Sequence, residues 1–204
     1  MLVKICGITN LQDALASVEF GADALGFNFY PKSHRYVAPE KVAKILEEVP
    51  PGIWKVGVFV NEPEQNVKDL SAALDLDFLQ FHGDETPSYC EQFSTPYWKA
   101  FRLKDEKTLE LMKKYKCEYY LVDTFIAQSY GGTGVTGNWD LAREAKKAGK
   151  IILAGGLTPE NVAVAIRTVG PDGVDVASGV EEKPGRKDAA KIERFISNVK
   201  ESGL

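Results

Sequence analysis

The sequence predicts an α/β protein in which parallel strands and helices alternate and the strands close into a barrel. Short β-rich runs alternate with amphipathic segments along the whole chain, and eight such repeats fit into 204 residues. An open doubly wound sheet rarely needs so many strands in so short a chain, whereas a (β/α)8 TIM barrel does. We therefore expect residues 1–204 to form a single barrel domain.

The expected strands are short runs rich in Val, Ile, Leu, Phe and Tyr. In chain order they cover residues 3–6, 24–29, 55–60, 77–81, 97–101, 119–123, 151–154 and 173–177. Apolar residues at helical spacing follow in four stripes, at Leu11, Ala14, Leu15 and Val18, and within residues 67–74, 162–169 and 192–199.

Local signals predict where some of these elements begin and end. Asn10 and Thr158 are suitable N-caps, and Pro159 suits the first position of a helix. The connection over residues 124–138 is unusually long for a compact domain. Long ordered loops of this kind often close over an active site.

Composition and charge exclude several classes of function. The formal charge is −4 and basic residues are interspersed with acidic ones, so no basic run could neutralise a line of phosphates. No apolar stretch approaches the roughly 20 residues that span a bilayer, and the first residues lack the pattern of a signal peptide. We expect no nucleic-acid partner, no membrane association and a cytoplasmic location.

The cysteines and histidines are spread widely along the chain. The chain has an odd number of cysteines, Cys6, Cys90 and Cys117, and they show no C-x-x-C spacing. Neither histidine, His34 or His82, has a cysteine or a pair of carboxylates at the spacing of metal ligands. We therefore expect neither a disulfide framework nor a metal site.

Two strand ends carry groups that could transfer protons. Cys6 ends the first expected strand and Asp123 ends the sixth, which lies across the barrel. Catalytic residues of barrel enzymes lie at such C-terminal strand ends, so the two groups could act on a small substrate between them. The alternatives are a thiol that packs as a small hydrophobic group and a carboxylate that caps a turn. As a base, Cys6 needs surroundings that lower its pKa from about 8.5.

Other strand ends carry candidate binding residues. Arg35 follows the second strand and could hold a carboxylate with its planar guanidinium, or it could be an ordinary surface arginine. His82 follows the fourth strand on the same face as Gln80, and a structural role competes with a functional one. Lys4 and Asp175 are both expected inside the barrel, where a structural ion pair is the first interpretation because burying either charge alone is costly.

Glycine-bearing loops follow the last two strands. Loops at these two positions of a barrel frequently bind phosphate through backbone N–H groups, and turning the chain is the simpler alternative. The candidate phosphate-binding residues are Gly155, Gly156, Ser178 and Gly179.

Five stretches stand out by their order and spacing: KICGIT, GFNFYPKSHRYV, QFHGDE, YGGTG with NWD, and the pair AGGLTPENV and DVASGVEEKPGRKD. Together they make the sequence resemble the phosphoribosylanthranilate isomerase family over nearly its whole length. The chain departs from the family pattern at Val135 and Gly137, where a lysine and an aromatic residue are common, and at Ala177, where serine is frequent.

The resemblance implies a reaction of L-tryptophan biosynthesis. This is the Amadori rearrangement of N-(5-phosphoribosyl)anthranilate to 1-(2-carboxyphenylamino)-1-deoxyribulose 5-phosphate. Cys6 would be the general base and Asp123 the general acid. Arg35 would bind the anthranilate carboxylate, and His82 would lie nearby in the substrate pocket. The glycine-bearing loops would surround the phosphate. No cofactor is implied, because the ring-opened substrate supplies its own electron sink. We expect a monomer or a homodimer.

Two other interpretations stay open. Another phosphate-binding barrel, an isomerase or lyase of histidine or tryptophan biosynthesis, would share the glycine loops. Related synthases use strand-end lysines and glutamates, so Lys55 and Lys99 are the lysines that this alternative would employ. A non-catalytic barrel that binds sugar phosphates would need neither Cys6 nor Asp123.

Overall fold

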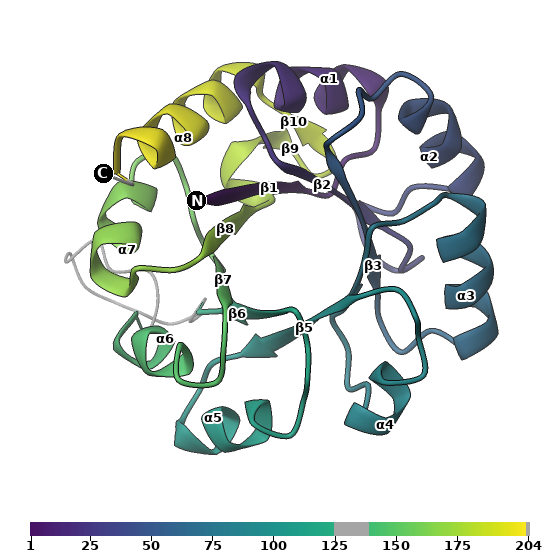
Figure 1. Cartoon of the computed structure of the whole chain (residues 1–204). Coiled ribbons are helices and arrows are strands. Elements are labelled where there is room, and N and C mark those ends of the chain that lie inside the picture. Colours follow the sequence, from purple (N-terminus) through teal and green to yellow (C-terminus); the bar gives the residue numbers. More distant parts are fainter. Residues whose placement is uncertain (125–138, 203–204) are drawn as a thin grey trace.

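A computed structural model describes residues 1–124 and 139–202 and contains a closed barrel of eight parallel strands (Figure 1). β1 pairs with β2 on one side and with β8 on the other, which closes the ring. Each strand agrees with its predicted range to within one residue at either end, so the predicted fold class is confirmed. The strands are β1 (Leu2–Cys6), β2 (Ala24–Asn28), β3 (Trp54–Phe59), β4 (Phe78–Phe81), β5 (Tyr97–Arg102), β6 (Tyr119–Asp123), β7 (Ile151–Ala154) and β8 (Gly173–Val176).

The helices form a layer around the outside of this ring (Figure 1). They are α1 (Leu11–Phe20), α2 (Pro39–Leu46), α3 (Glu64–Ala73), α4 (Pro87–Cys90), α5 (Glu106–Met112), α6 (Trp139–Ala145), α7 (Val162–Val169) and α8 (Ala189–Ser202). Their apolar faces and the outward faces of the strands make the larger core. In the described part of the chain, none of the helices is long and apolar enough to span a membrane.

Two expectations about the helices are corrected by the structure. α7 begins at Val162 rather than after Thr158, because the side chain of Asn161 accepts a bond from the Thr158 N–H at 2.8 Å and donates to the Gly156 carbonyl at 2.9 Å. These bonds hold the intervening residues in a turn. In α1, Asn10 caps the helix as predicted, but Leu15 is 40% exposed and a face around Ala14 packs inward instead.

A second, smaller core fills the inside of the barrel. Its buried members are Ala24, Val56, Trp98, Ala100, Leu121, Ile152 and Ala154. Lys4 and Asp175 share this interior and form the expected ion pair, with Nζ and Oδ1 2.7 Å apart. Aromatic rings at the beginnings of the strands, such as Trp54 and Phe78 with centroids 4.8 Å apart, pack onto the same cluster. Space for a ligand therefore remains at the opposite, C-terminal strand ends.

The chain between β8 and α8 adds elements that the sequence pattern did not predict. They are a 3-10 turn η1 (Ser178–Val180) and an antiparallel hairpin of β9 (Glu181–Lys183) and β10 (Arg186–Lys187). The hairpin lies beside β1 and α1 (Figure 1), and the Thr9 hydroxyl donates to the Gly185 carbonyl at 2.6 Å.

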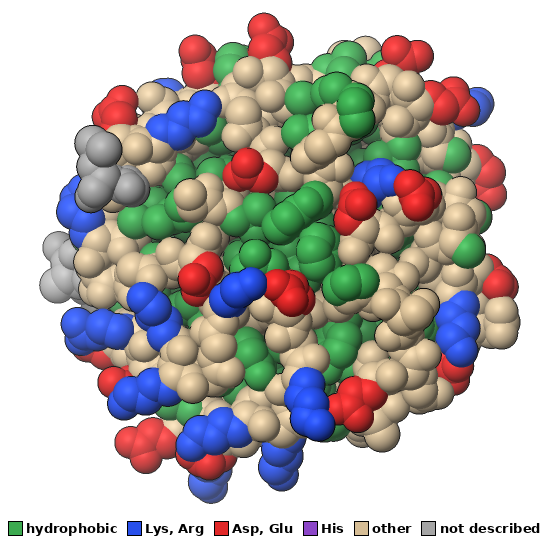
Figure 2. Space-filling view, in the orientation of Figure 1, with side chains coloured by type: hydrophobic (Ala, Val, Ile, Leu, Met, Phe, Trp, Pro, Cys, Tyr) green, Lys and Arg blue, Asp and Glu red, His purple; other side chains and the backbone are tan. Residues whose placement is uncertain are grey.

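The surface carries both signs of charge. In the orientation of Figure 1, hydrophobic side chains gather toward the middle of the visible face, and Lys, Arg, Asp and Glu side chains lie both beside this apolar area and around the edge (Figure 2). No large field of a single sign is visible on this face.

Candidate active site

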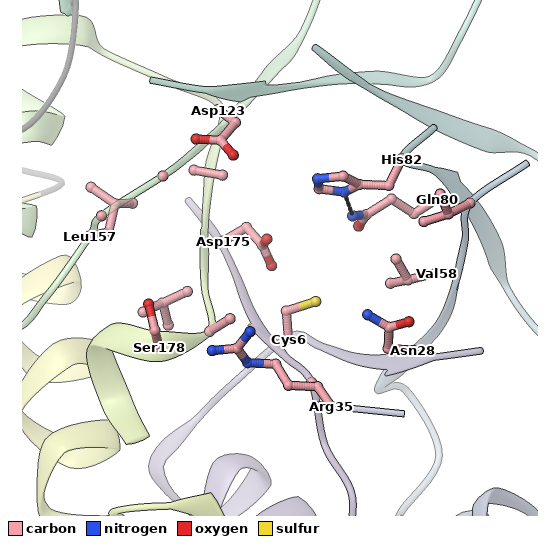
Figure 3. A pocket seen from close by; sticks show the side chains of 17 residues that line it. Cys6, Asn28, Arg35, Val58, Gln80, His82, Asp123, Leu157, Asp175 and Ser178 are labelled. Carbon is pink, nitrogen blue, oxygen red and sulfur yellow. Dashed lines mark hydrogen bonds between the residues drawn. The ribbon is translucent and has the colours of Figure 1, made fainter. Parts of the chain in front are cut away.

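A cavity of about 370 Å³ lies at the C-terminal ends of the strands, where barrel enzymes place their chemistry (Figure 3). The structure brings seven of the eight predicted site residues to its wall, although they come from six separate strand-loop units. They are Cys6, Arg35, His82, Asp123, Gly155, Gly156 and Ser178.

Strand alternation explains why Cys6 faces this cavity. Val3 and Ile5 point outward into the larger core, so Lys4 and Cys6 point into the barrel. Gly26 on β2 pairs with Cys6, and a Cβ atom at that position would lie 2.8 Å from the Cys6 Sγ. Only glycine leaves room for the thiol. A glycine inside a strand signals such a close approach, but sequence analysis did not use this signal.

Burial and charge set the protonation state of Cys6. The thiol is 9% exposed, and desolvation raises its pKa. The positive charge of Lys4 acts in the lowering direction and the negative charge of Asp175 in the raising direction, and the net pKa lies above the ordinary value. The lowered pKa that a basic thiol requires is therefore not met in the free protein, because desolvation outweighs the effect of the ammonium. The thiol is protonated at neutral pH.

Asp123 lies across the cavity from Cys6 (Figure 3). It ends β6, next to Arg102 of β5, and its backbone carbonyl accepts a bond from the Leu103 N–H at 3.0 Å. The strand ladder thus holds the backbone from which the carboxylate projects. A small molecule in the cavity would have the thiol on one side and this carboxylate on the other.

Gln80 orients the ring of His82. The amide Nε2 of Gln80 lies 2.9 Å from Nδ1 of His82, and this hydrogen bond fixes the orientation of the ring. Burial lowers the pKa of His82, which keeps the ring neutral. Figure 3 shows the ring pointing into the cavity, where its second nitrogen can form a hydrogen bond with a ligand. Among the described residues, the buried Oε1 of Gln80 has no partner, which leaves a second polar atom at this wall.

Arg35 is not a surface arginine, since Glu181 holds its guanidinium from one side. Nε and Nη2 donate to the two carboxylate oxygens at 2.8 and 2.7 Å. These hydrogen bonds raise the pKa of Arg35. Gly7 has φ of +79°, and a Cβ there would lie 2.5 Å from the Arg35 Cδ, so glycine lets the arginine cross the end of β1. Sequence analysis missed both Glu181 and Gly7.

The loops after β7 and β8 form another wall. Gly155 and Gly156 have φ of +88° and +68°, in the left-handed region that glycine tolerates. Within the described residues, their N–H groups donate to no backbone acceptor. Gly179 does not line the cavity; a Cβ there would lie 1.8 Å from the Leu157 carbonyl oxygen, so glycine lets the two loops pack together.

The lysines of the alternative synthase interpretation lie outside the cavity. The Lys99 ammonium donates to the Gly83 carbonyl at 2.8 Å, and the Lys55 ammonium donates to Asp75 at 2.6 Å. Among the departures from the family pattern, Ala177 lines the cavity, whereas Val135 and Gly137 lie outside the described residues. Within residues 1–124 and 139–202, no group of His, Cys, Asp and Glu is arranged to hold a metal ion.

Comparison with known proteins agrees with this geometry. The family of N-(5'-phosphoribosyl)anthranilate (PRA) isomerases matches residues 3–198. The N-(5'-phosphoribosyl)anthranilate isomerase of Geobacter sulfurreducens is 51% identical over 97% of this chain and 98% of its own length. That of Trichlorobacter lovleyi is 51% identical, covering 98% of both chains.

Solved structures give the same result. The phosphoribosyl anthranilate isomerase of Thermotoga maritima superimposes with a TM-score of 0.91 at 43% identity, over 98% of this chain and 99% of its own. A second structure of such an isomerase, in complex with reduced 1-(o-carboxyphenylamino)-1-deoxyribulose 5-phosphate, has a TM-score of 0.89 at 43% identity over 98% of this chain and all of its own. This chain belongs to the phosphoribosylanthranilate isomerase family.

Proposed function

We propose that this isomerase converts N-(5'-phosphoribosyl)anthranilate to 1-(2-carboxyphenylamino)-1-deoxyribulose 5-phosphate with Cys6 as the base and Asp123 as the acid. The observation that supports the assignment of roles is the placement of these two groups on opposite sides of one cavity (Figure 3). General acid–base catalysis by positioned groups of this kind typically contributes about 10²–10⁴-fold to a rate.

The two ends of the substrate would be held by different walls. The Arg35 guanidinium offers the N–H groups that do not bind Glu181 to the anthranilate carboxylate. The N–H groups of Gly155 and Gly156 are available to the phosphate, with the start of η1 at Ser178 beside them. Two anionic handles fix the sugar between acid and base.

The reaction would begin at Asp123, which protonates the ribose ring oxygen. The ring then opens to an iminium, and Cys6 removes the proton from C2′ to give an enolamine, which tautomerises to the product. The base must first lose its own proton to solvent, and Asp123 must carry the proton that it donates. Lys4 favours the thiolate, and the positive charge that develops on the substrate nitrogen favours it further. Deprotonation of Cys6 is thereby coupled to the substrate.

By this mechanism the reaction would need no cofactor. The iminium withdraws electrons from C2′, so the substrate supplies the electron sink that a cofactor would otherwise provide. The neutral His82 would form a hydrogen bond with a polar group of the substrate near the sugar.

We also propose a domain organisation, a location and an oligomeric state for this isomerase. Residues 1–204 would act as one domain, in the cytoplasm, as a monomer or a homodimer. A structure of monomers generated from the dimeric enzyme of Thermotoga maritima matches this chain over its whole length. Sedimentation of the purified protein would decide the oligomeric state.

The direct test is turnover of freshly generated phosphoribosylanthranilate in the presence of EDTA, followed by loss of substrate fluorescence. We expect cofactor-free turnover that is lost in Cys6→Ala. A folded wild-type protein that does not consume the substrate would contradict the proposal, and an active Cys6→Ala variant would remove Cys6 from the mechanism.

A further inference from the structure

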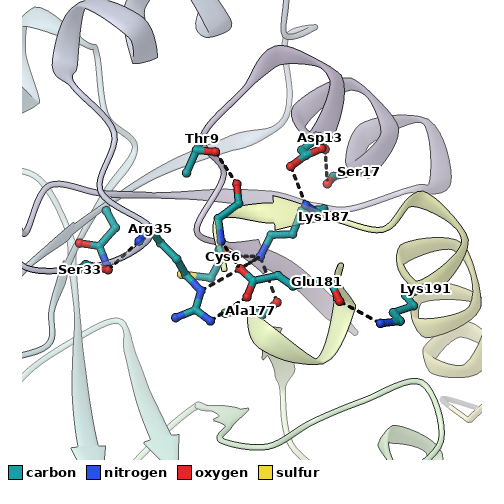
Figure 4. Close-up of polar contacts among 12 residues, drawn as sticks. Cys6, Thr9, Asp13, Ser17, Ser33, Arg35, Ala177, Glu181, Lys187 and Lys191 are labelled. Atoms are coloured by element: carbon teal, nitrogen blue, oxygen red, sulfur yellow. Dashed lines mark hydrogen bonds and ion pairs between the residues drawn. The ribbon is translucent and has the colours of Figure 1, made fainter. Parts of the chain in front are cut away.

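The ammonium of Lys187, in the hairpin after β8, is buried directly behind the cavity wall (Figure 4). Its Nζ donates to the carbonyl of Cys6 at 2.6 Å, to the carbonyl of Ala177 at 3.0 Å and to Oε1 of Glu181 at 3.1 Å. An ammonium has three N–H donors, so each donor has one acceptor. The side chain is wholly inaccessible to solvent.

Two of the three acceptors belong to residues that line the cavity, and the third belongs to the residue that holds Arg35. The first is the backbone of Cys6 itself. The second, Ala177, directly precedes Ser178 in the loop after β8. The third, Glu181, holds the guanidinium of Arg35 through both carboxylate oxygens. One cation therefore connects the thiol-bearing strand end, one glycine-bearing loop and the guanidinium.

Lys187 is itself held firmly. Its backbone N–H donates to Oδ2 of Asp13 in α1 at 2.7 Å, and Asn10 donates to the same oxygen at 2.7 Å. On the other side of the hairpin, the Lys191 ammonium donates to the Glu181 carbonyl at 2.8 Å. The hairpin is thus anchored by α1 and by α8, and the position of the ammonium is fixed from both sides.

Burying the charges of Lys187 and Glu181 costs free energy of desolvation. Burial lowers the pKa of Lys187 in spite of Glu181, whereas burial of Glu181 is outweighed by its hydrogen bonds and ion pairs with Arg35 and Lys187, so the pKa of that carboxylate is lowered. A protein in which apolar residues replace a buried ion pair is often equally stable. The Lys187–Glu181 pair is therefore better explained by the groups that it holds in place than by a contribution to stability. An apolar side chain here could bind neither carbonyl nor the carboxylate.

We propose that Lys187 is a positioning residue for the isomerase reaction, which fixes Cys6, the loop at Ser178 and the Glu181–Arg35 pair in one mutual geometry. The inference rests on the proposed roles of Cys6 and Arg35. Lys187 touches no substrate; it acts through the groups that do. A misplacement of about 1 Å in a reacting group can lower a rate by about 10²-fold, which sets the scale of the effect.

Removing the ammonium would also change the charge around the thiol. In the part of the chain that the structure describes, the charged groups that act on Cys6 are Lys4 in β1, Asp175 in β8, Lys187 in β10 and Arg35 after β2. Lys187 acts in the lowering direction on the pKa of Cys6. Without it, the pH at which the thiol ionises should rise, and a role confined to folding would not move that pH.

The experiment compares Lys187→Met with Lys183→Met, which removes an exposed ammonium from the same hairpin. We expect Lys187→Met to lower kcat by roughly 10–100-fold and to raise KM, with the pH profile of Cys6 alkylation by iodoacetamide displaced upward. Lys183→Met should match the wild type in all three. Circular dichroism and thermal melting establish that both variants are folded.

The outcomes separate this inference from the proposed function. A wild type that consumes the substrate, together with a Lys187→Met variant of unchanged kcat/KM and pH profile, overturns the positioning role alone. If Lys187→Met does not fold, Lys187→Gln, with two N–H donors, takes its place under the same criteria. If neither folds, the lysine serves folding and the inference fails.

If the wild type itself is inactive, the proposed function fails. The pH dependence of Cys6 alkylation by iodoacetamide then tests Lys187 alone. An alkylation profile that Lys187→Met leaves unchanged would overturn the role of this lysine.

Discussion

Two buried Lys–Glu pairs lie behind the cavity, at different strand ends. Lys187 and Glu181, 3.1 Å apart, lie behind β1, whereas Lys99 and Glu85, 3.3 Å apart, lie behind β4. Both ammonium groups also bind backbone carbonyls. Lys99 donates to the carbonyls of Phe81, Gly83 and Ala100, and the first two of these flank His82. A buried Lys–Glu pair therefore lies behind the thiol of Cys6 and another lies behind the ring of His82.

The two pairs differ in the cavity residues that they support. The Lys187 pair supports the proposed base and the guanidinium, so its loss should affect the chemical step. The Lys99 pair supports a neutral histidine that would only bind substrate, and its ammonium also lies over the rings of Phe101 and Tyr115. Its loss should affect stability and substrate binding. Four predictions test this contrast.

The largest effect is expected from the proton-transfer groups themselves. Cys6→Ala and Asp123→Asn should each lower kcat by about 10²–10⁴-fold, because each removes one positioned acid or base. Steady-state kinetics at saturating substrate measure the loss, and Cys117→Ala, away from the cavity, is the control for thiol removal. Near-wild-type turnover in either variant would exclude that residue from proton transfer.

The second effect is a dependence on pH. The raised pKa of Cys6 means that the thiolate fraction of the free protein grows as pH increases. We expect the rate of Cys6 alkylation by iodoacetamide to rise about tenfold per pH unit between pH 6 and 8, because only the thiolate reacts. A profile that is already flat at pH 7 would show that the thiol is ionised in the free protein, contrary to the effect of its burial.

Arg35→Met should come next in size. It removes the charged partner of the carboxylate, whose hydrogen bonds are worth about 1.5–3 kcal/mol, so KM should rise roughly 10–100-fold. The kcat value should fall much less than in Cys6→Ala. Glu181→Gln, which keeps the guanidinium but weakens its support, serves as the graded comparison and should give a smaller rise in KM. An unchanged KM in Arg35→Met would place the carboxylate elsewhere.

The smallest effect on catalysis is expected from Lys99→Met. Removing one partner of a buried pair leaves Glu85 uncompensated, which typically lowers the free energy of unfolding by about 3–5 kcal/mol. We expect this loss in denaturant unfolding, together with a kcat within about threefold of wild type and a modest rise in KM. A fall in kcat as large as that of Lys187→Met would abolish the distinction between the two pairs.

The sequence by itself determined the barrel and most of the cavity wall. Strand periodicity is a local property, so eight apolar runs and their ends could be placed to within one residue, and Cys6, Asp123 and His82 followed as strand-end positions. Helix starts were less secure. The side-chain bonds of Asn161 displaced the start of α7 from the position that Thr158 and Pro159 indicated.

Only the tertiary structure decided how these residues work. The bonds between Arg35 and Glu181 join positions 146 apart in the chain, and the bond from Lys187 to Cys6 joins positions 181 apart. The raised pKa of Cys6 likewise depends on burial and on Asp175, which comes from the other end of the sequence. Such contacts leave no periodic trace, because they arise only when barrel closure places β8 and the following hairpin beside β1.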